Sequence, residues 1–144
     1  MRIVLDTSIL VRATEKSAGP ARELLLHCVA SKHILVLSNE ILYELARVLR
    51  YPRLQTVYGL SDARIYDYLA FLREVSENVA LSPTLAVPSR DVNDVVVLQT
   101  AVIGEADVLC TRDEDFYSAP AADFLKEAGV QVLDEILLLQ RLRS

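Results

Sequence analysis

The sequence predicts an α/β fold: a three-layer α/β/α domain built on a doubly wound parallel sheet. Short apolar runs alternate with stretches of helical spacing along the chain, which is the pattern of strands separated by crossover helices. The runs do not alternate polar with apolar residues, so each strand is expected to be buried on both faces. A chain of 144 residues, 52% of them hydrophobic, with four glycines and five prolines has the composition of one folded domain. We therefore expect a single domain over residues 1–144.

The expected elements follow one another in a regular order. Apolar runs predict strands at 2–6, 33–38, 78–81, 107–111 and 130–133. Helical spacing of apolar residues predicts helices at about 18–31, 39–50, 61–77, 92–104 and 121–129, and a last helix after residue 133. Pro52 is expected to end the second helix, and Ser61 or Asp62 to cap the third.

Charge and hydropathy narrow the class of protein. The formal net charge of −5 argues against a protein that coats nucleic acid through bulk positive charge. It leaves room for an enzyme that binds a few phosphates through metal ions and a local basic patch. No apolar run approaches the length of a membrane span, and the N-terminal segment lacks a signal-peptide pattern. We therefore expect a cytoplasmic protein with no membrane association.

Cysteine and histidine are too few and too scattered for a metal site of their own. Cys28 and Cys110 lie in apolar contexts, and we expect them to be buried free thiols rather than a disulfide. His27 and His33 do not stand at zinc-ligand spacing to a cysteine or a glutamate. A zinc site is therefore not expected.

Carboxylates follow two of the predicted strands at the point where each ends. Asp6 ends the first apolar run, and Asp113 and Asp115 come directly after the strand at 107–111. Ligands of doubly wound sheets bind beyond the carboxyl ends of the strands, where the strand order reverses. If these two strands are neighbours, their acids share one crevice. The alternative for Asp6 is that it caps the helix that follows it.

Two further acidic pairs lie on predicted helices. Glu44, with Glu40 one turn before it, lies opposite the apolar face of its helix, where pairing with Arg47 also explains it. Asp91 and Asp94 open the helix at 92–104, as a cap and a first-turn acid commonly do. That helix is apolar almost all round, so Asp94 is expected to face the end of the sheet. Carboxylates that converge in one crevice repel one another unless a hard cation, Mg²⁺ or Mn²⁺, neutralises them.

The same segments carry a family resemblance. VLDTSIL (4–10), LSNEILYELARVLR (37–50), DVNDVVVLQTA (91–101) and ADVLCTRDEDF (106–116) together resemble the motifs of PIN domains. The chain is most similar to the prokaryotic single-domain branch described as toxins of toxin–antitoxin modules, the VapC-type ribonucleases. The resemblance covers nearly the whole chain, and it rests on the order and spacing of all four motifs.

The resemblance implies a doubly wound fold and a set of catalytic acids. By position in the motifs, these are Asp6, Glu44, Asp94 and Asp113, with Asp115 as a nearby auxiliary. Two positions depart from the pattern, because Asn93 stands where many relatives have an acid, and Ser8 stands where many have asparagine. Both departures keep an oxygen atom available.

The implied activity is Mg²⁺- or Mn²⁺-dependent cleavage of RNA with one or two ions. Asp6, Asp94 and Asp113 are expected to be the principal metal ligands, and Glu44 and Asp115 to bind a second ion or orient its waters. Neighbouring polar residues are expected to hold these carboxylates in place, namely Thr7, Ser8, Asp91, Asn93 and Thr111.

A basic strip is the predicted RNA-binding surface. Residues 45–61 are without an acid before the cap of the third helix and carry Arg47, Arg50 and Arg53. Tyr51 and Tyr58 lie between them and are suited to stacking on unpaired bases. The alternative is that these arginines only complement the dipole at a helix C-terminus. Arg112, beside Asp113, is a further candidate for a phosphate contact.

The resemblance also implies a homodimer and a small antitoxin that blocks the cleft. On the third helix, Tyr66, Leu69, Leu72 and Arg73 are consistent with either a dimer face or the core, and the core is the preferred interpretation. A PIN-like scaffold that binds RNA or protein without cleavage is the alternative function. A phosphoaspartate enzyme of the haloacid dehalogenase type is disfavoured, because its second aspartate would stand where this chain has Ser8.

Overall fold

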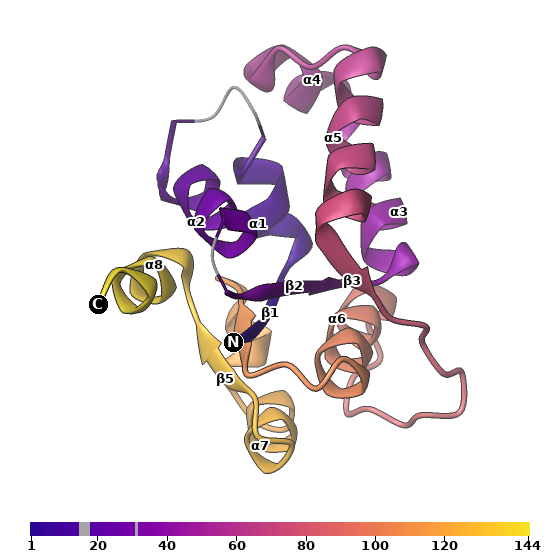
Figure 1. Ribbon diagram of the computed structural model, residues 1–144. Helices are drawn as coiled ribbons and strands as arrows, with labels where there is room; N and C mark the ends of the chain where they lie inside the picture. Colours follow the sequence, from indigo (N-terminus) through magenta and orange to yellow (C-terminus); the bar gives the residue numbers. More distant parts are fainter. Residues whose placement is uncertain (15–17, 31) are drawn as a thin grey trace.

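One parallel sheet organises the molecule (Figure 1). The computed structural model describes residues 1–14, 18–30 and 32–144. Within them, five strands form a sheet in the order β3-β2-β1-β4-β5, with every pair of neighbours parallel. The strands are β1 Arg2–Leu5, β2 Ile34–Leu37, β3 Ser76–Asn78, β4 Val108–Cys110 and β5 Gln131–Leu133.

Helices cover the sheet on both sides. In Figure 1, α1, α2 and α8 lie above the sheet, and α6 and α7 lie below it. The helices are α1 Thr7–Arg12, α2 Pro20–Ala30, α3 Asn39–Leu49, α4 Pro52–Tyr58, α5 Asp62–Val75, α6 Val92–Ile103, α7 Ala121–Glu127 and α8 Glu135–Arg143, with a 3₁₀ turn η1 at Glu114–Phe116. The predicted three-layer α/β/α class is confirmed.

The strand order reverses between β1 and β4. From β1 the chain adds β2 and then β3 on one side, and it returns to place β4 on the other side of β1. Ile3 is in register with both Leu35 of β2 and Val108 of β4. The strands that precede Asp6 and Asp113 are therefore neighbours, as the crevice hypothesis requires, and their carboxyl ends form the switch point of the doubly wound sheet.

The core follows the central strands. Ile3, Val4 and Leu5 are fully buried, because helices pack on both faces of β1. Cys28 and Cys110 are buried free cysteines, as predicted. No helix in the part of the chain that the structure describes has the length and hydropathy to cross a membrane.

Two helices were not predicted from the sequence. The six residues of α1 start immediately after Asp6, which is too short a segment for apolar periodicity to become visible. Pro52 ends α3 as predicted, but it also opens α4. Proline is favourable at the first helical position, where its missing N–H would have no partner in the helix.

The third predicted strand is displaced. It was expected at 78–81 and lies at Ser76–Asn78, because α5 ends at Val75. The cap of α5 is Ser61, whose hydroxyl accepts a hydrogen bond from the Arg64 N–H. On the same helix Leu72 is fully buried and Leu69 packs against the core, whereas Tyr66 is 73% exposed.

Candidate active site

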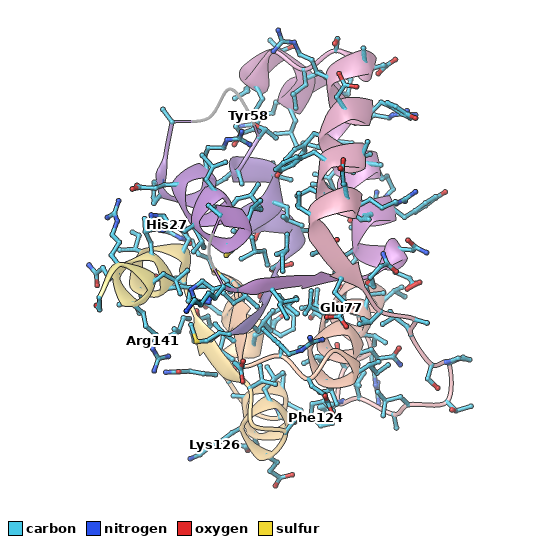
Figure 2. The ribbon with its side chains drawn as sticks, in the orientation of Figure 1. His27, Tyr58, Glu77, Phe124, Lys126 and Arg141 are labelled. Carbon is cyan, nitrogen blue, oxygen red and sulfur yellow. The ribbon has the colours of Figure 1, made fainter. Side chains whose placement is uncertain are left out.

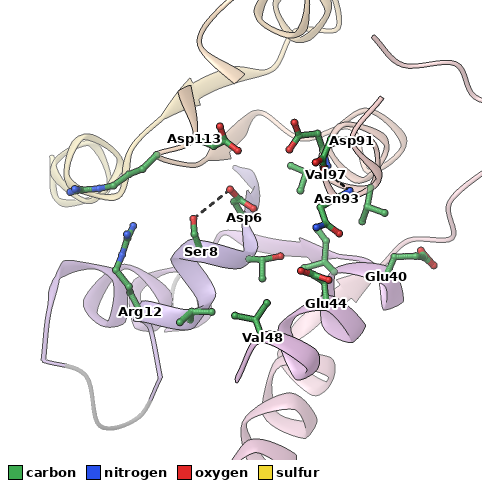
Figure 3. A pocket seen from close by; sticks show the side chains of 16 residues that line it. Asp6, Ser8, Arg12, Glu40, Glu44, Val48, Asp91, Asn93, Val97 and Asp113 are labelled. Atoms are coloured by element: carbon green, nitrogen blue, oxygen red, sulfur yellow. Dashed lines mark hydrogen bonds between the residues drawn. The ribbon is translucent and has the colours of Figure 1, made fainter. Parts of the chain in front are cut away.

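A cavity of about 550 Å³ opens at the carboxyl ends of β1 and β4. Figure 3 shows Asp6 and Asp113 facing one another within it, with Glu40 and Glu44 at one side and Arg12 at the other. The polar and charged lining comes from α1, α3, the start of α6 and the loop after β4, and it consists of Asp6, Thr7, Ser8, Arg12, Glu40, Glu44, Asp91, Asn93, Asp94, Arg112 and Asp113.

Asp6 forms the buried floor of the cavity. The residue is 9% exposed, and its backbone N–H donates to the Cys110 carbonyl at 3.0 Å, which joins the ends of β1 and β4. Its carboxylate accepts a 2.7 Å hydrogen bond from the Thr111 hydroxyl. Burial raises the pKa of Asp6 above its ordinary value, against the effect of the Thr111 hydrogen bond.

The alternative explanation of Asp6 as a helix cap is wrong. Asp6 occupies the N-cap position of α1, but its side chain makes no capping hydrogen bond. The carboxylate is turned toward Thr111 on the neighbouring strand end instead. The long 3.5 Å contact from the Ser8 hydroxyl is the weaker of its two side-chain hydrogen bonds.

Three carboxylates form a close group beside Asp6. One oxygen from each of Asp94, Asp113 and Asp115 lies within 4.8 Å of the other two. The Asp91 carboxylate caps α6 by accepting from the Asn93 and Asp94 N–H groups at 2.9 and 3.1 Å. Asp113 caps η1 in the same way, by accepting from the Asp115 N–H at 3.0 Å. These two caps fix the backbone on which the group of three is built.

The negative charge in this group has no ion-pair partner among the residues that the structure describes. Among the described residues, no lysine or arginine lies within ion-pair distance of Asp6, Asp94, Asp113 or Asp115. Burial, reinforced by repulsion from Asp113 and Asp91, raises the pKa of Asp94 to about 6. The structure thus has a concentration of carboxylates whose mutual repulsion a bound cation would relieve.

The donor set suits a hard divalent cation. Carboxylate oxygens are the ligands that Mg²⁺ and Mn²⁺ prefer. The described residues that line the cavity include no histidine or cysteine, so nothing among them favours zinc. Asp115, which the sequence placed as an auxiliary, lies in the group of three, but it lines a neighbouring cavity with Asp94 rather than the active-site cavity. Asp6 and Glu44 line the active-site cavity but lie outside the group of three.

Glu44 points into the cavity but already has a partner. Arg47 donates to both of its carboxylate oxygens, at 2.7 and 3.0 Å. The same guanidinium donates to the Tyr51 hydroxyl at 2.6 Å and lies 5.7 Å from the centre of that ring. The pairing of Glu44 with Arg47, considered from the sequence as the alternative to a metal role, is therefore present in the structure.

The predicted substrate-binding arginines divide into two sets. Arg112 lines the cavity. Arg47, Arg50 and Arg53 are exposed on α3, at its C-cap and on α4, and they are not among the described residues that line the cavity. The acids and Arg112 are thus brought together, and the basic strip lies outside them.

Arg12, which lines this cavity, was not predicted, and neither was its partner Glu135, which lies outside the lining. Arg12 belongs to α1, the helix that the sequence did not reveal. Glu135 is the first residue of α8 and is 2% exposed. Its carboxylate forms ion pairs with Arg12 and Arg112. In the sequence Glu135 is an ordinary acid in the first turn of a helix. Its neighbours along the chain give no indication that it pairs with Arg12 and Arg112.

Comparisons with known proteins agree with the fold. A family model described as PIN domain matches residues 2–115. A chain in the crystal structure of VapBC2 from Rickettsia felis bound to a DNA fragment from its promoter superposes with a TM-score of 0.62 at 16% sequence identity, over 93% of this chain and 98% of that chain. At this identity the similarity shows the fold alone. No curated protein sequence matches the chain.

Proposed function

The chain belongs to the PIN domain family, and from this we propose that it is a metal-dependent ribonuclease that hydrolyses phosphodiester bonds of RNA. PIN domains are generally nucleases. The assignment of RNA as substrate, and of Mg²⁺ or Mn²⁺ as the cation, extends that family property to this chain.

One observation carries the proposal. Asp94, Asp113 and Asp115 converge within 4.8 Å beside the buried Asp6, at the switch point of the sheet and without a neutralising lysine or arginine among the described residues. Repulsion among these carboxylates destabilises the folded state unless a bound cation relieves it. Hence the group supports a divalent-cation site better than a structural role.

In this proposal the residues of the site have different roles. Asp94, Asp113 and Asp115 would hold a divalent cation, with Asp6 and Glu44 available to a second ion or to its water ligands. A divalent cation bound there supplies a nucleophilic water of lowered pKa and charge relief on the phosphate oxygens. Thr111 positions Asp6 and the Asp113 backbone at once, while Asp91 fixes Asp94. Thr7, Ser8 and Asn93 complete the polar lining.

We also propose a biological setting. The fold shared with a chain of the VapBC2 crystal structure supports a toxin of a toxin–antitoxin module, with a small antitoxin as partner. In this proposal the chain is a single domain over 1–144 that forms a homodimer and acts in the cytoplasm.

Cleavage of RNA by the purified protein tests the function. Structured and single-stranded RNA are incubated with Mg²⁺, with Mn²⁺ and with chelator. We expect cleavage only with metal, and a loss of at least about a hundredfold in Asp6→Asn and Asp113→Asn. Asp123→Asn, an exposed acid on α7, is the matched control and retains activity.

Two results would overturn the proposal. One is an Asp113→Asn variant that folds and keeps full metal-dependent cleavage. The other is a wild-type protein that binds RNA tightly but leaves it intact with either metal, which is the behaviour of the PIN-like scaffold considered from the sequence.

A further inference from the structure

Arg12 and Arg112 share one buried carboxylate at the edge of the active-site cavity. Arg112 Nε lies 2.7 Å from Oε1 and 2.8 Å from Oε2 of Glu135, and Arg12 Nη2 donates to Oε1 at 3.1 Å. The Glu135 side chain is 3% exposed, whereas those of Arg12 and Arg112 are 38% and 47% exposed. We call Arg12 and Arg112 the arginine pair.

The arginine pair separates two cavities. Both arginines line the active-site cavity, and both also line a second cavity of about 310 Å³, here called the side cavity. The rest of the side cavity is formed by Gly19, Pro20, Ala21, Tyr58 and Glu135. Figure 2 shows Tyr58 between α4 and the helices α1 and α2. A ligand that spans both cavities must pass the two guanidinium groups.

The charge of this edge differs from that of the cavity it borders. Two guanidinium groups and one carboxylate leave a net charge of +1, and Glu135 is the single acid among the described residues of the side cavity. Glu135 raises the pKa of Arg112 above its ordinary value, so the guanidinium stays charged. The arginine pair therefore favours an anion at a place that lies past the carboxylates of the active site.

The chemistry of the side cavity matches one nucleotide. Guanidinium groups bind phosphate through paired N–H donors. A tyrosine ring stacks on an unpaired base without regard to its identity. The volume lies at the lower end of the range for small-ligand sites.

We propose that the arginine pair and the side cavity bind one nucleotide of single-stranded RNA next to the scissile phosphate. The two guanidinium groups contact its phosphate, Tyr58 stacks on its base, and Glu135 positions both arginines without touching the RNA. The inference rests on the proposed ribonuclease function, and it places the substrate strand on the α1–α8 side of the active site.

RNA binding without cleavage tests the arginine pair. The probe is a short fluorescein-labelled single-stranded RNA, whose dissociation constant is measured by anisotropy over a salt series, with Ca²⁺ and again with chelator. Arg12→Ala and Arg112→Ala are each expected to weaken binding about tenfold at low salt. Each should also reduce the slope of log K against log salt by less than about 0.7, because the second guanidinium still contacts the one phosphate. Arg73→Ala, an exposed arginine on α5, is the control for the loss of one positive charge.

Tyr58 provides a test that does not disturb the ion pairs. Tyr58→Leu keeps an apolar side chain against the core but removes the ring, and we expect about tenfold weaker binding with an unchanged salt slope. Tyr58→Phe keeps the ring and is expected to bind like the wild type.

Glu135→Gln separates positioning from charge. The variant adds one net positive charge, so simple attraction predicts tighter RNA binding. Positioning predicts weaker binding, because an amide cannot hold both guanidinium groups as the carboxylate does. We expect about fivefold weaker binding and a raised KM for cleavage with little change in kcat. If this variant does not fold, as judged by its thermal transition, the Arg12 and Tyr58 variants decide.

The inference fails if the arginine variants bind RNA like Arg73→Ala, or if Tyr58→Leu binds like Tyr58→Phe. It also fails if these variants lose only the binding of a protein partner, since an acidic protein segment would then be the occupant. Wild-type cleavage combined with unchanged RNA binding in the variants overturns the inference and leaves the proposed function intact. Weaker binding in the variants without wild-type cleavage overturns the function and keeps the nucleotide site.

Discussion

Thr111 connects the Asp6 carboxylate to the Asp113 backbone. Its hydroxyl donates to Asp6 Oδ2 at 2.7 Å and accepts from the Asp113 N–H at 3.0 Å. Thr111 is fully buried, so water does not compete for either bond. One side chain therefore sets the relative position of two acids that are separated by more than a hundred residues in the sequence.

Replacement of Thr111 should impair the site more than the fold. Thr111→Val keeps the shape of the side chain but removes both hydrogen bonds, and we expect a 10- to 100-fold loss of cleavage rate, the usual effect of losing a group that orients metal ligands. Thr111→Ser keeps the hydroxyl and should retain most of the activity. Initial rates at saturating Mn²⁺ give the comparison, and equal rates for the two variants would contradict it.

Asp94→Asn should stabilise the metal-free protein at neutral pH. The Asp94 carboxyl has a pKa of about 6 in the folded chain against an ordinary 3.8, so the folded state binds more protons between these values. Stability therefore falls as pH rises through this window, and the penalty is complete above about pH 6. Removing the charge should recover about 1 kcal/mol at pH 7, since solvent screens a partly exposed group.

Thermal unfolding with chelator measures this effect. The variant should melt about 3 °C above the wild type at pH 7, and the two should converge below about pH 3, where the wild-type carboxyl is protonated in both states. A variant that melts below the wild type at pH 7 would show that repulsion among these acids is not a significant term.

The affinity for a divalent cation should rise with pH, whereas the stability of the metal-free protein should fall. A cation displaces the proton from Asp94, so Mn²⁺ affinity is expected to rise from pH 5 to pH 7 and to level off above the pKa of about 6. The measurement is the increase in melting temperature at a fixed Mn²⁺ concentration across this range. An increase that is the same at pH 5 and pH 7 would exclude Asp94 as a ligand.

Glu44 and Asp113 should differ in their effect on the first ion. Both carboxylate oxygens of Glu44 already accept hydrogen bonds from Arg47, and Glu44 lies outside the group of three. Glu44→Gln is therefore expected to change the affinity for the first Mn²⁺ by less than about threefold, whereas Asp113→Asn should lower it at least about tenfold. Calorimetric titration at pH 7.5 distinguishes them, and equal losses would assign Glu44 to the same ion.

Most of the sheet was readable from local pattern. The runs that became β1, β2 and β4 are apolar without alternation, because both of their faces are buried. The displaced β3 shows the limit of that signal. Its residues Ser76–Asn78 are polar, and only the end of α5 and pairing with β2 define them as a strand.

The acids of the site could also be predicted from the sequence, but their arrangement in space could not. Asp6, Asp94 and Asp113 could be named because each follows a strand or opens a buried helix, positions that point to one edge of a parallel sheet. The membership of Asp115 in the group of three depends on the 3₁₀ turn that Asp113 caps. The role of each acid remains a prediction.

The amino-acid sequence alone determined the fold class, the family and the acids to be considered, because these depend on residue type and on spacing along the chain. The tertiary structure decided that β1 and β4 are neighbours and that Arg12 and Arg112 meet at Glu135. Those contacts join residues from different elements, and their existence depends on how helices pack around the sheet. The spacing of residues along the chain does not predict how the helices pack.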